Sequence, residues 1–159
     1  MNQKLVEILK SETKSLKEQY INLTIEYAEK EFNRYMEMAK WTYEQWEEKF
    51  PLRYMNGNIL SKEGANLKYN IVPKAKRMGK ENFIQRAKEE AINHYENSIL
   101  KLANRIEKKG LNIDNLQVKT SHVGVNIETV LTDGEKTVRA FTIVAGGMVQ
   151  RPHYRYLIK

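Results

Sequence analysis

Apolar side chains recur at steps of three and four residues through the first fifty positions, with charged residues between them. The longest stripe consists of Ile21, Ile25, Ala28, Phe32, Met36, Ala39, Tyr43, Trp46 and Phe50. This spacing is typical of one face of an amphipathic helix, and neither glycine nor proline interrupts it. An unbroken helix of this length would span roughly 70 Å, more than the width of a domain of this size. We therefore expect the helix either to break or to pair with its copy in a homo-oligomer through residues 1–50.

Residues 51–79 interrupt the helical pattern. Pro51 ends the first helical segment, and the next residues include four more potential helix breakers: Gly57, Gly64, Pro73 and Gly79. We expect an irregular connector, in which residues 58–60 and 67–72 form short strands. Helical spacing returns from about Lys80 to Lys109, and Gly110 then follows two lysines. This ending is typical of a helix C-cap, because glycine tolerates the left-handed backbone and the cations match the helix dipole.

From about Asn115 the apolar residues alternate with polar ones, which is the pattern of half-buried strands. Asp133-Gly134 between two such runs is typical of a two-residue hairpin turn. The next strand covers residues 135–145, and Gly146-Gly147 forms the turn before a last strand over residues 149–158. The pattern predicts an α+β fold: two long N-terminal helices followed by a C-terminal antiparallel β-meander of three or four strands.

The two turns decide which side chains lie together on this sheet. A two-residue turn at Asp133-Gly134 places Glu128 opposite Arg139. A two-residue turn at the second site would pair Arg139 with Tyr154, whereas a three-residue turn would pair Arg139 with His153. We favour the second register, because it buries the neighbouring tyrosine rings and leaves the cations in water.

Length and composition narrow the classes of protein. The chain has 159 residues, and we expect a single domain over 1–159, made of a helical segment 1–50, a basic connector 51–79, a helix 80–110 and a β-meander 111–159. Cysteine is absent, which excludes disulfides and thiol nucleophiles. The three histidines are scattered and no cofactor motif is present, so we expect neither metal nor cofactor. No apolar run approaches the ~20 residues of a membrane span, and we expect a cytoplasmic protein without a membrane partner.

The formal net charge is +7, and it is unevenly distributed. Residues 51–80 carry seven basic side chains against the single acid Glu63, while residues 1–50 have a net charge of −2. Four of these cations crowd into one stretch: Lys74, Lys76, Arg77 and Lys80. Such a patch attracts polyanions, although a solvated basic loop would look the same in sequence.

A second cationic surface is expected on the predicted sheet. Its basic members are Arg139, Arg151, His153 and Arg155, and Phe141 is the exposed aromatic ring beside them. Arginines next to an aromatic ring suit phosphate contact combined with base stacking. The alternative is an edge strand whose arginines discourage pairing with other chains.

The same strands allow a catalytic alternative. Glu128 would act as general base on a ribose 2′-hydroxyl, and His153 would protonate the leaving oxygen. Arg139 and Arg155 would stabilise the charge that develops on the phosphorane. This arrangement would make a metal-independent ribonuclease, and its layout is similar to that of barnase-like and RelE-like ribonucleases, a likeness of fold alone.

The C-terminal stretch TVRAFTIVAGGMVQRPHYRYLIK resembles the C-termini of small, mostly uncharacterised proteins of phages and integrated mobile elements. The resemblance covers the chain from about Asn115 onwards and carries no catalytic motif. It implies an anti-defence setting in a host cytoplasm, such as an anti-CRISPR protein or a nucleotide sponge. We therefore expect a non-catalytic protein that binds nucleic acid, a nucleotide or a host defence nucleoprotein. The alternatives are the ribonuclease and a helical dimerisation protein.

Overall fold

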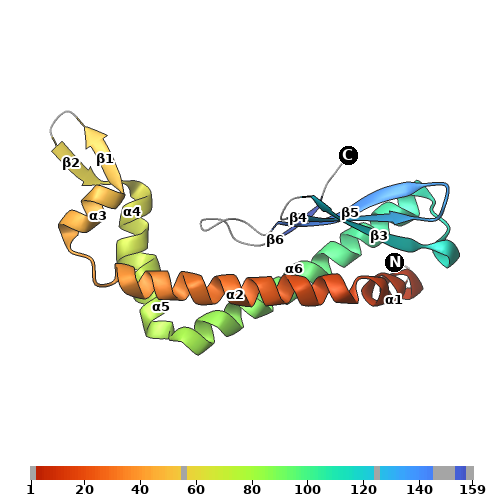
Figure 1. Ribbon diagram of the computed structural model, residues 1–159, viewed down its shortest axis with the longest axis horizontal. Coiled ribbons are helices and arrows are strands. Elements are labelled where there is room, and N and C mark those ends of the chain that lie inside the picture. The colour runs from red at the N-terminus through yellow and green to blue at the C-terminus, as the bar shows by residue number, and fades with distance from the viewer. Residues whose placement is uncertain (1–2, 55–56, 124–125, 145–152, 157–159) are drawn as a thin grey trace. The chain divides into compact units, whose positions relative to one another are not determined.

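The computed structural model describes residues 3–54, 57–123, 126–144 and 153–156 (Figure 1). The elements follow in the order α1 Gln3–Glu12, α2 Lys14–Met38, α3 Tyr43–Lys49, β1 Pro51–Tyr54, β2 Gly57–Leu60, α4 Lys62–Asn66, a π-helical turn Leu67–Ile71, α5 Val72–Met78, α6 Lys80–Lys109, a 3-10 turn Ile113–Asn115, β3 Gln117–Val123, β4 Asn126–Thr132, β5 Thr137–Val144 and β6 His153–Tyr156. The fold is α+β, as the sequence predicts. Strands β3 to β6 form an antiparallel meander in chain order.

Contacts group the chain into two compact units. The first, here called the sheet unit, comprises Met1–Tyr27 and Ala87–Lys159; the second, the hairpin unit, comprises Ala28–Arg86. The boundaries fall inside α2 and α6, so each of these helices contributes to both units. The expectation of a single domain stays a prediction.

Residues 3–50 form three helices, so the break, one of the two expected alternatives, is confirmed. Thr13 separates α1 from α2, and its hydroxyl donates to the Leu9 carbonyl at 2.6 Å. A threonine that bonds back to the preceding turn in this way bends a helix. The second break precedes Thr42, whose side chain accepts from the Gln45 amide while the Gln45 side chain accepts from the Thr42 amide. This capping box starts α3.

Eight large apolar residues of these helices are buried inside the chain, whereas Tyr43 of α3 is exposed. In the sheet unit they are Leu5, Leu9, Leu16 and Tyr20; in the hairpin unit they are Phe32, Tyr35, Met38 and Trp46. A second copy of the chain is therefore not needed to cover them. The homo-oligomer through residues 1–50 remains a prediction.

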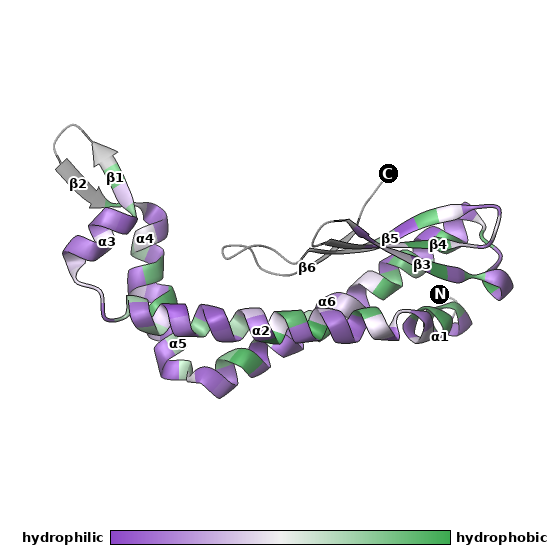
Figure 2. Cartoon of the chain, in the orientation of Figure 1, coloured by the Kyte–Doolittle hydropathy of each residue, from purple (hydrophilic) through white to green (hydrophobic). Residues whose placement is uncertain are grey.

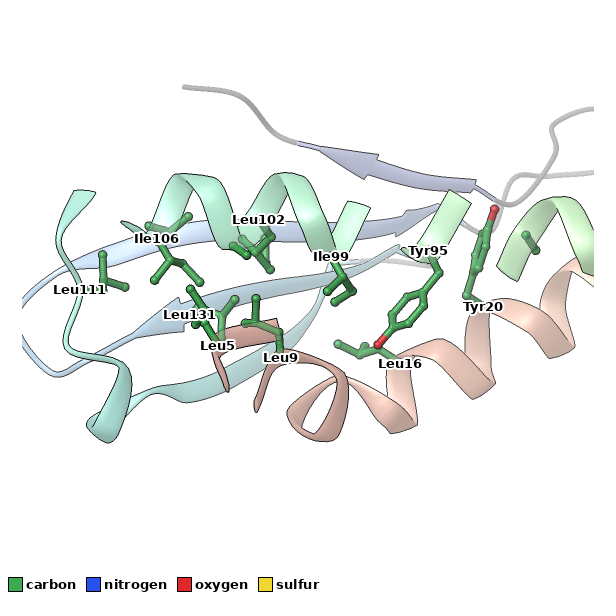
Figure 3. Close-up of a cluster of buried hydrophobic side chains, with 14 residues drawn as sticks. Leu5, Leu9, Leu16, Tyr20, Tyr95, Ile99, Leu102, Ile106, Leu111 and Leu131 are labelled. Atoms are coloured by element: carbon green, nitrogen blue, oxygen red, sulfur yellow. The ribbon is translucent and has the colours of Figure 1, made fainter. Parts of the chain in front are cut away.

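Helix α6 supplies one side of the sheet unit's core, and it begins and ends where the sequence predicts. Figure 3 shows Tyr95, Ile99, Leu102 and Ile106 along the side of α6 that meets α1 and the strands. The sheet adds Leu131, Val138 and Ala140 to this cluster. Each large apolar side chain buried in it contributes about 1.5–3 kcal/mol. Gly110 ends the helix with φ +73, the left-handed conformation of the predicted C-cap.

The hairpin between β4 and β5 is wider than predicted. Thr132 pairs with Thr137, so the loop holds four residues and not two. Asp133 is the reason, because its Oδ1 accepts hydrogen bonds from the amides of Glu135 and Lys136. Side-chain bonds of this kind offer the backbone an alternative to the tight Asp-Gly turn. Arg139 therefore lies opposite Val130, and its predicted pairing with Glu128 is wrong.

A β-bulge changes the pairing again further along β5. Glu128 pairs with Thr142 while Val130 pairs with Arg139, so Ala140 and Phe141 both lie opposite Thr129. On the other side of β5, Val144 pairs with His153 and Ile143 with Tyr154. Neither register considered for the last turn is therefore right. The predicted Gly146-Gly147 turn lies outside the described residues.

The hairpin unit replaces the predicted irregular connector with regular structure. Strands β1 and β2 form an antiparallel hairpin, which confirms a strand at residues 58–60. A helical run then continues from Lys62 to Met78, so the strand expected at residues 67–72 is wrong. Ser61 starts this run by accepting from the Gly64 amide at 3.0 Å. Leu67, Val72 and Ala75 turn their apolar side chains into the hairpin unit's core.

Candidate anion-binding surfaces

The cations predicted to form a patch lie on an exposed helical segment of the hairpin unit. Lys74, Lys76 and Arg77 are on α5, Lys80 is the first residue of α6, and all four are exposed. Figure 2 shows the hydrophilic residues at this point, where α5 ends and α6 begins. Lys80 forms an ion pair with Glu29 at 3.1 Å. Within the described residues, no ion pair involves the other three.

The segment after Glu63 is rich in basic side chains and contains no acidic ones. No aspartate or glutamate occurs between Glu63 and Glu81, a stretch that contains five cations. The helical run also carries a regular exposed face, at steps of four, four, four and three residues: Lys62, Asn66, Asn70, Lys74 and Arg77. A row of cations and amides is suited to a polyanion, because its members carry no negative charge, and Glu63 lies beside only the Lys62 end of the row.

Lys68 of the helical run contacts the rings of two exposed tyrosines, Tyr69 of the same run and Tyr43 of α3. The Lys68 ammonium lies 4.2 Å from the ring centroid of Tyr43 and 5.2 Å from that of Tyr69. The Tyr69 residue is 60% exposed and Tyr43 is 47% exposed. Partial desolvation, followed by the Glu47 carboxylate, raises the pKa of the Tyr43 hydroxyl. The cation–π contacts hold both rings beside the helix without burying them.

A shallow, open pocket of about 640 Å³ lies beside Tyr69. Its described lining residues are Lys62, Glu63, Ala65, Asn66, Tyr69 and Asn70. The Asn70 side-chain amide donates to the Asn66 side-chain oxygen at 3.0 Å. The pocket therefore combines an aromatic wall with two neighbouring carboxamides.

Sequence reasoning missed this aromatic part of the surface. Tyr43 belongs to the apolar stripe, which predicts a core position, and Tyr69 falls in a segment that was expected to form a strand. A helical interpretation of residues 62–78 would have found the site, because Lys62, Asn66 and Asn70 recur every four residues.

The predicted cationic surface of the sheet unit is distributed over neighbouring rows of the sheet. Arg139 lies in the row of Lys119 and Val130, and both cations are exposed. Arg155 takes its register position opposite Thr142, in the row of half-buried Glu128. His153 pairs with Val144, in the row of Asn126. Asn126, Glu128 and Val130 are alternate residues of β4, so the three rows follow one another on one face of that strand.

The row Glu128–Arg139–His153 predicted for catalysis is not formed, because its members occupy three different rows. Within the described residues, no hydrogen bond or ion pair joins Glu128 to Arg139. Phe141 pairs with Tyr156 beside the bulge. Arg151 lies outside the described residues.

The part of the chain that the structure describes contains neither a candidate metal site nor a candidate membrane-spanning helix. The His, Asp and Glu side chains there form no group of three that could hold a metal ion. None of the helices described there combines the length and the apolar content of a bilayer span. Comparison with protein-family models, curated proteins and solved structures finds no match to this chain.

Proposed function

We propose that this protein binds nucleic acid, a nucleotide or a nucleoprotein complex through cationic surfaces, without catalysing a reaction. The observation that carries the proposal is the segment of the helical run after Glu63, which holds no acidic residue and has Lys74, Lys76 and Arg77 exposed along it. The exposed cations Lys119 and Arg139 of the sheet unit support it. A role against host defence rests on the resemblance of the C-terminal segment and belongs to the same proposal.

Electrostatics explains why such a surface would bind. Each lysine or arginine that neutralises a phosphate releases a condensed counterion, so affinity rises with the number of contacts and falls with salt. The net charge of +7 adds a general attraction, which is concentrated where residues 51–80 lie. Exposed cations can meet phosphates without the desolvation cost that buried charges carry.

The test is a paired gel experiment with labelled structured RNA in EDTA. The proposal predicts a shift on the native gel with intact RNA on the denaturing gel, and a weaker shift for the double variant Lys74→Ala/Arg77→Ala. Lys10→Ala/Lys14→Ala is the matched control, because it removes the same charge from exposed positions near Glu12. Equal binding by wild type and both double variants would contradict the assignment of the surface.

The denaturing gel also tests the ribonuclease alternative. Fragments produced in EDTA by the wild type and lost in His153→Ala would establish catalysis and overturn the proposal of a binding protein. Intact RNA with a native shift would leave binding as the function. If the gels show neither a shift nor fragments, and nucleotides also fail to bind, the proposal that the protein binds nucleic acid or a nucleotide is contradicted.

A further inference from the structure

We propose that the exposed face of the helical run Lys62–Met78 binds single-stranded nucleic acid, with an unpaired base stacked on Tyr69 and phosphates held by Lys74 and Arg77. This inference rests on the proposed function and specifies its ligand. It is independent of the sheet unit, since every residue involved belongs to the hairpin unit.

Tyr69 is the first reason for proposing stacking. At 60% exposure it is more exposed than the other exposed large apolar residues of the described chain, Tyr43 and Leu100. A ring with an open face can stack a base of any sequence, and such a contact is usually the main non-electrostatic part of single-strand binding. A helix position that served packing alone would turn this ring inward, as the buried Leu67 two residues earlier does.

The ring is also held in place before any ligand arrives. Lys68 lies over Tyr69 at 5.2 Å and over Tyr43 at 4.2 Å, so one cation links the rings of two different helices. Restricting the ring lowers the entropy that a ligand must remove on binding. The π-helical turn Leu67–Ile71, which contains both Lys68 and Tyr69, is a local widening of the kind that recurs at functional sites.

The pocket beside Tyr69 has a mostly apolar surface, and two carboxamide residues among its lining could meet a base edge. Asn66 and Asn70 line it, and only one amide hydrogen of Asn70 is needed for the 3.0 Å bond between them. The remaining donor and acceptor capacity of two carboxamides matches the edge of a nucleobase. Its volume of about 640 Å³ lies within the range of sites for small ligands.

The charged side chains indicate which end of the helical run would contact the base of a bound nucleic-acid strand and which end would contact its phosphates. Glu63 lines the pocket, so a phosphate there would be repelled, whereas the acid-free segment begins directly after it. Lys74 and Arg77 continue the same face at steps of four and three residues beyond Asn70. A bound strand would therefore place its base at the Tyr69 end and its backbone along α5.

The same features exclude the competing polyanions as the preferred ligand. In a duplex each base is covered on both faces by its stacked neighbours, so Tyr69 would have nothing to stack on. An acidic peptide would satisfy the cations but would leave the ring and the carboxamides without a matching partner. Single-stranded RNA and DNA share the required chemistry, and the experiment separates them.

The test measures fluorescence anisotropy with a short labelled RNA strand, the DNA strand of the same sequence and the matching duplex. Tyr69→Ala should weaken single-strand binding by roughly tenfold or more, as expected for loss of one stacked base. Tyr69→Phe keeps the stacking face and should stay within about twofold of wild type. Leu100→Ala, which truncates an exposed apolar residue of α6 in the sheet unit, is the matched control and should change nothing.

The possible outcomes distinguish the stacking inference from the proposed function on which it rests. If Tyr69→Ala binds single strands as wild type does, while Lys74→Ala/Arg77→Ala loses affinity, the stacking inference is overturned and the proposed function stands. Tighter binding of the duplex than of either single strand would also overturn the inference. Absence of binding by the wild type to all three probes would overturn the inference together with the proposed function. Circular dichroism of Tyr69→Ala checks that the exposed substitution leaves the fold intact.

Discussion

The Asp133 carboxylate joins three backbone amides around one loop. Oδ1 accepts from Lys136 at 2.7 Å and from Glu135 at 2.9 Å, and Oδ2 accepts from Asn112 at 2.8 Å. These bonds, that of Lys136 first, lower the pKa of Asp133 from 3.8 to about 2, because they favour the ionised form. The side chain thereby fixes the β4–β5 loop to the segment that follows α6.

This carboxylate predicts a pH-dependent stability. Since the folded pKa lies below 3.8, the ionised group stabilises the fold above that pH, and the contribution is lost as the pH falls towards 2. Asp133→Asn should lower the free energy of unfolding near neutral pH. The difference from wild type should shrink as the pH is lowered towards 2. Urea unfolding at a series of pH values measures it, and a difference that does not change with pH would contradict this role.

Thr13 and Tyr95 form a buried polar pair at the break between α1 and α2. Thr13 is 0% exposed and Tyr95 is 1% exposed. Because the Thr13 hydroxyl hydrogen is given to Leu9, the Tyr95 hydroxyl donates the 2.7 Å bond to Thr13. Burial raises the pKa of Tyr95, in agreement with a protonated hydroxyl at this position.

Removing this pair should show coupling between the two residues. Thr13→Val keeps the shape and loses both hydrogen bonds, so it should destabilise the fold by about 1–3 kcal/mol. Tyr95→Phe should have a similar cost, and the double variant should lose less than the sum of the single changes. Chemical unfolding of the four proteins gives the cycle. Strict additivity would mean that the 2.7 Å contact does not contribute.

At the scale of elements, two glycines are required for different reasons: Gly64 inside the helical run for close packing, and Gly79 directly after it for its backbone conformation. A Cβ added to Gly64 would lie 2.5 Å from the Phe50 Cβ, so glycine allows α4 to approach the end of α3. Gly79 has φ +84 with no atom within 4 Å of an added Cβ, and it ends α5 by its backbone conformation alone.

These roles predict different effects of the same substitution. Alanine in a helix interior normally stabilises by about 0.5–1 kcal/mol relative to glycine, but Gly64→Ala should destabilise, because the Phe50 Cβ must move. Since α3 carries Tyr43, the change should also weaken the contact of Tyr43 with Lys68. Gly79→Ala is the control, with a cost of about 1–3 kcal/mol from backbone strain alone. Thermal unfolding measures both, and a stabilising Gly64→Ala would refute the close approach.

The same residues explain which elements the sequence could predict. α6 was predicted from end to end because its apolar spacing is regular and Gly110 caps it. The sequence pattern does not predict the helical run, because glycine and proline, here Gly64 and Pro73, usually interrupt helices. Gly64 is there for close packing, and Pro73 falls in the first turn of α5, where its missing amide costs little.

Strand register was the least predictable feature. Alternation fixed which residues of β4 and β5 are buried up to Ala140, and Leu131, Val138 and Ala140 are indeed buried. The four-residue loop depends on hydrogen bonds to the Asp133 side chain, which the apolar pattern does not indicate. The bulge opposite Thr129 cannot be predicted from the alternation of apolar and polar residues either. The wider loop moves the partner of Arg139 from Glu128 to Val130, whereas the bulge shifts only the pairs beyond Ala140; Arg139 itself stays exposed.

At the scale of the whole molecule, charge was more predictable than the candidate site. The excess over residues 51–80 follows from the sequence alone, and the four cations predicted to form a patch, Lys74, Lys76, Arg77 and Lys80, are exposed. What the sequence could not supply was their arrangement on a helical run, beside an exposed tyrosine and two carboxamides. The proposal of a nucleic-acid ligand depends on that arrangement.

The most direct measurement of the central claim is the salt dependence of binding to a labelled single-stranded RNA. The account predicts that log K falls linearly with log salt, and that Lys74→Ala/Arg77→Ala reduces the magnitude of the slope by roughly 1.4, since each phosphate contact on a single strand contributes about 0.7. Lys10→Ala/Lys14→Ala should leave the slope nearly unchanged. Binding that is insensitive to salt, or an equal loss of slope in both double variants, would contradict a phosphate-binding surface on α5.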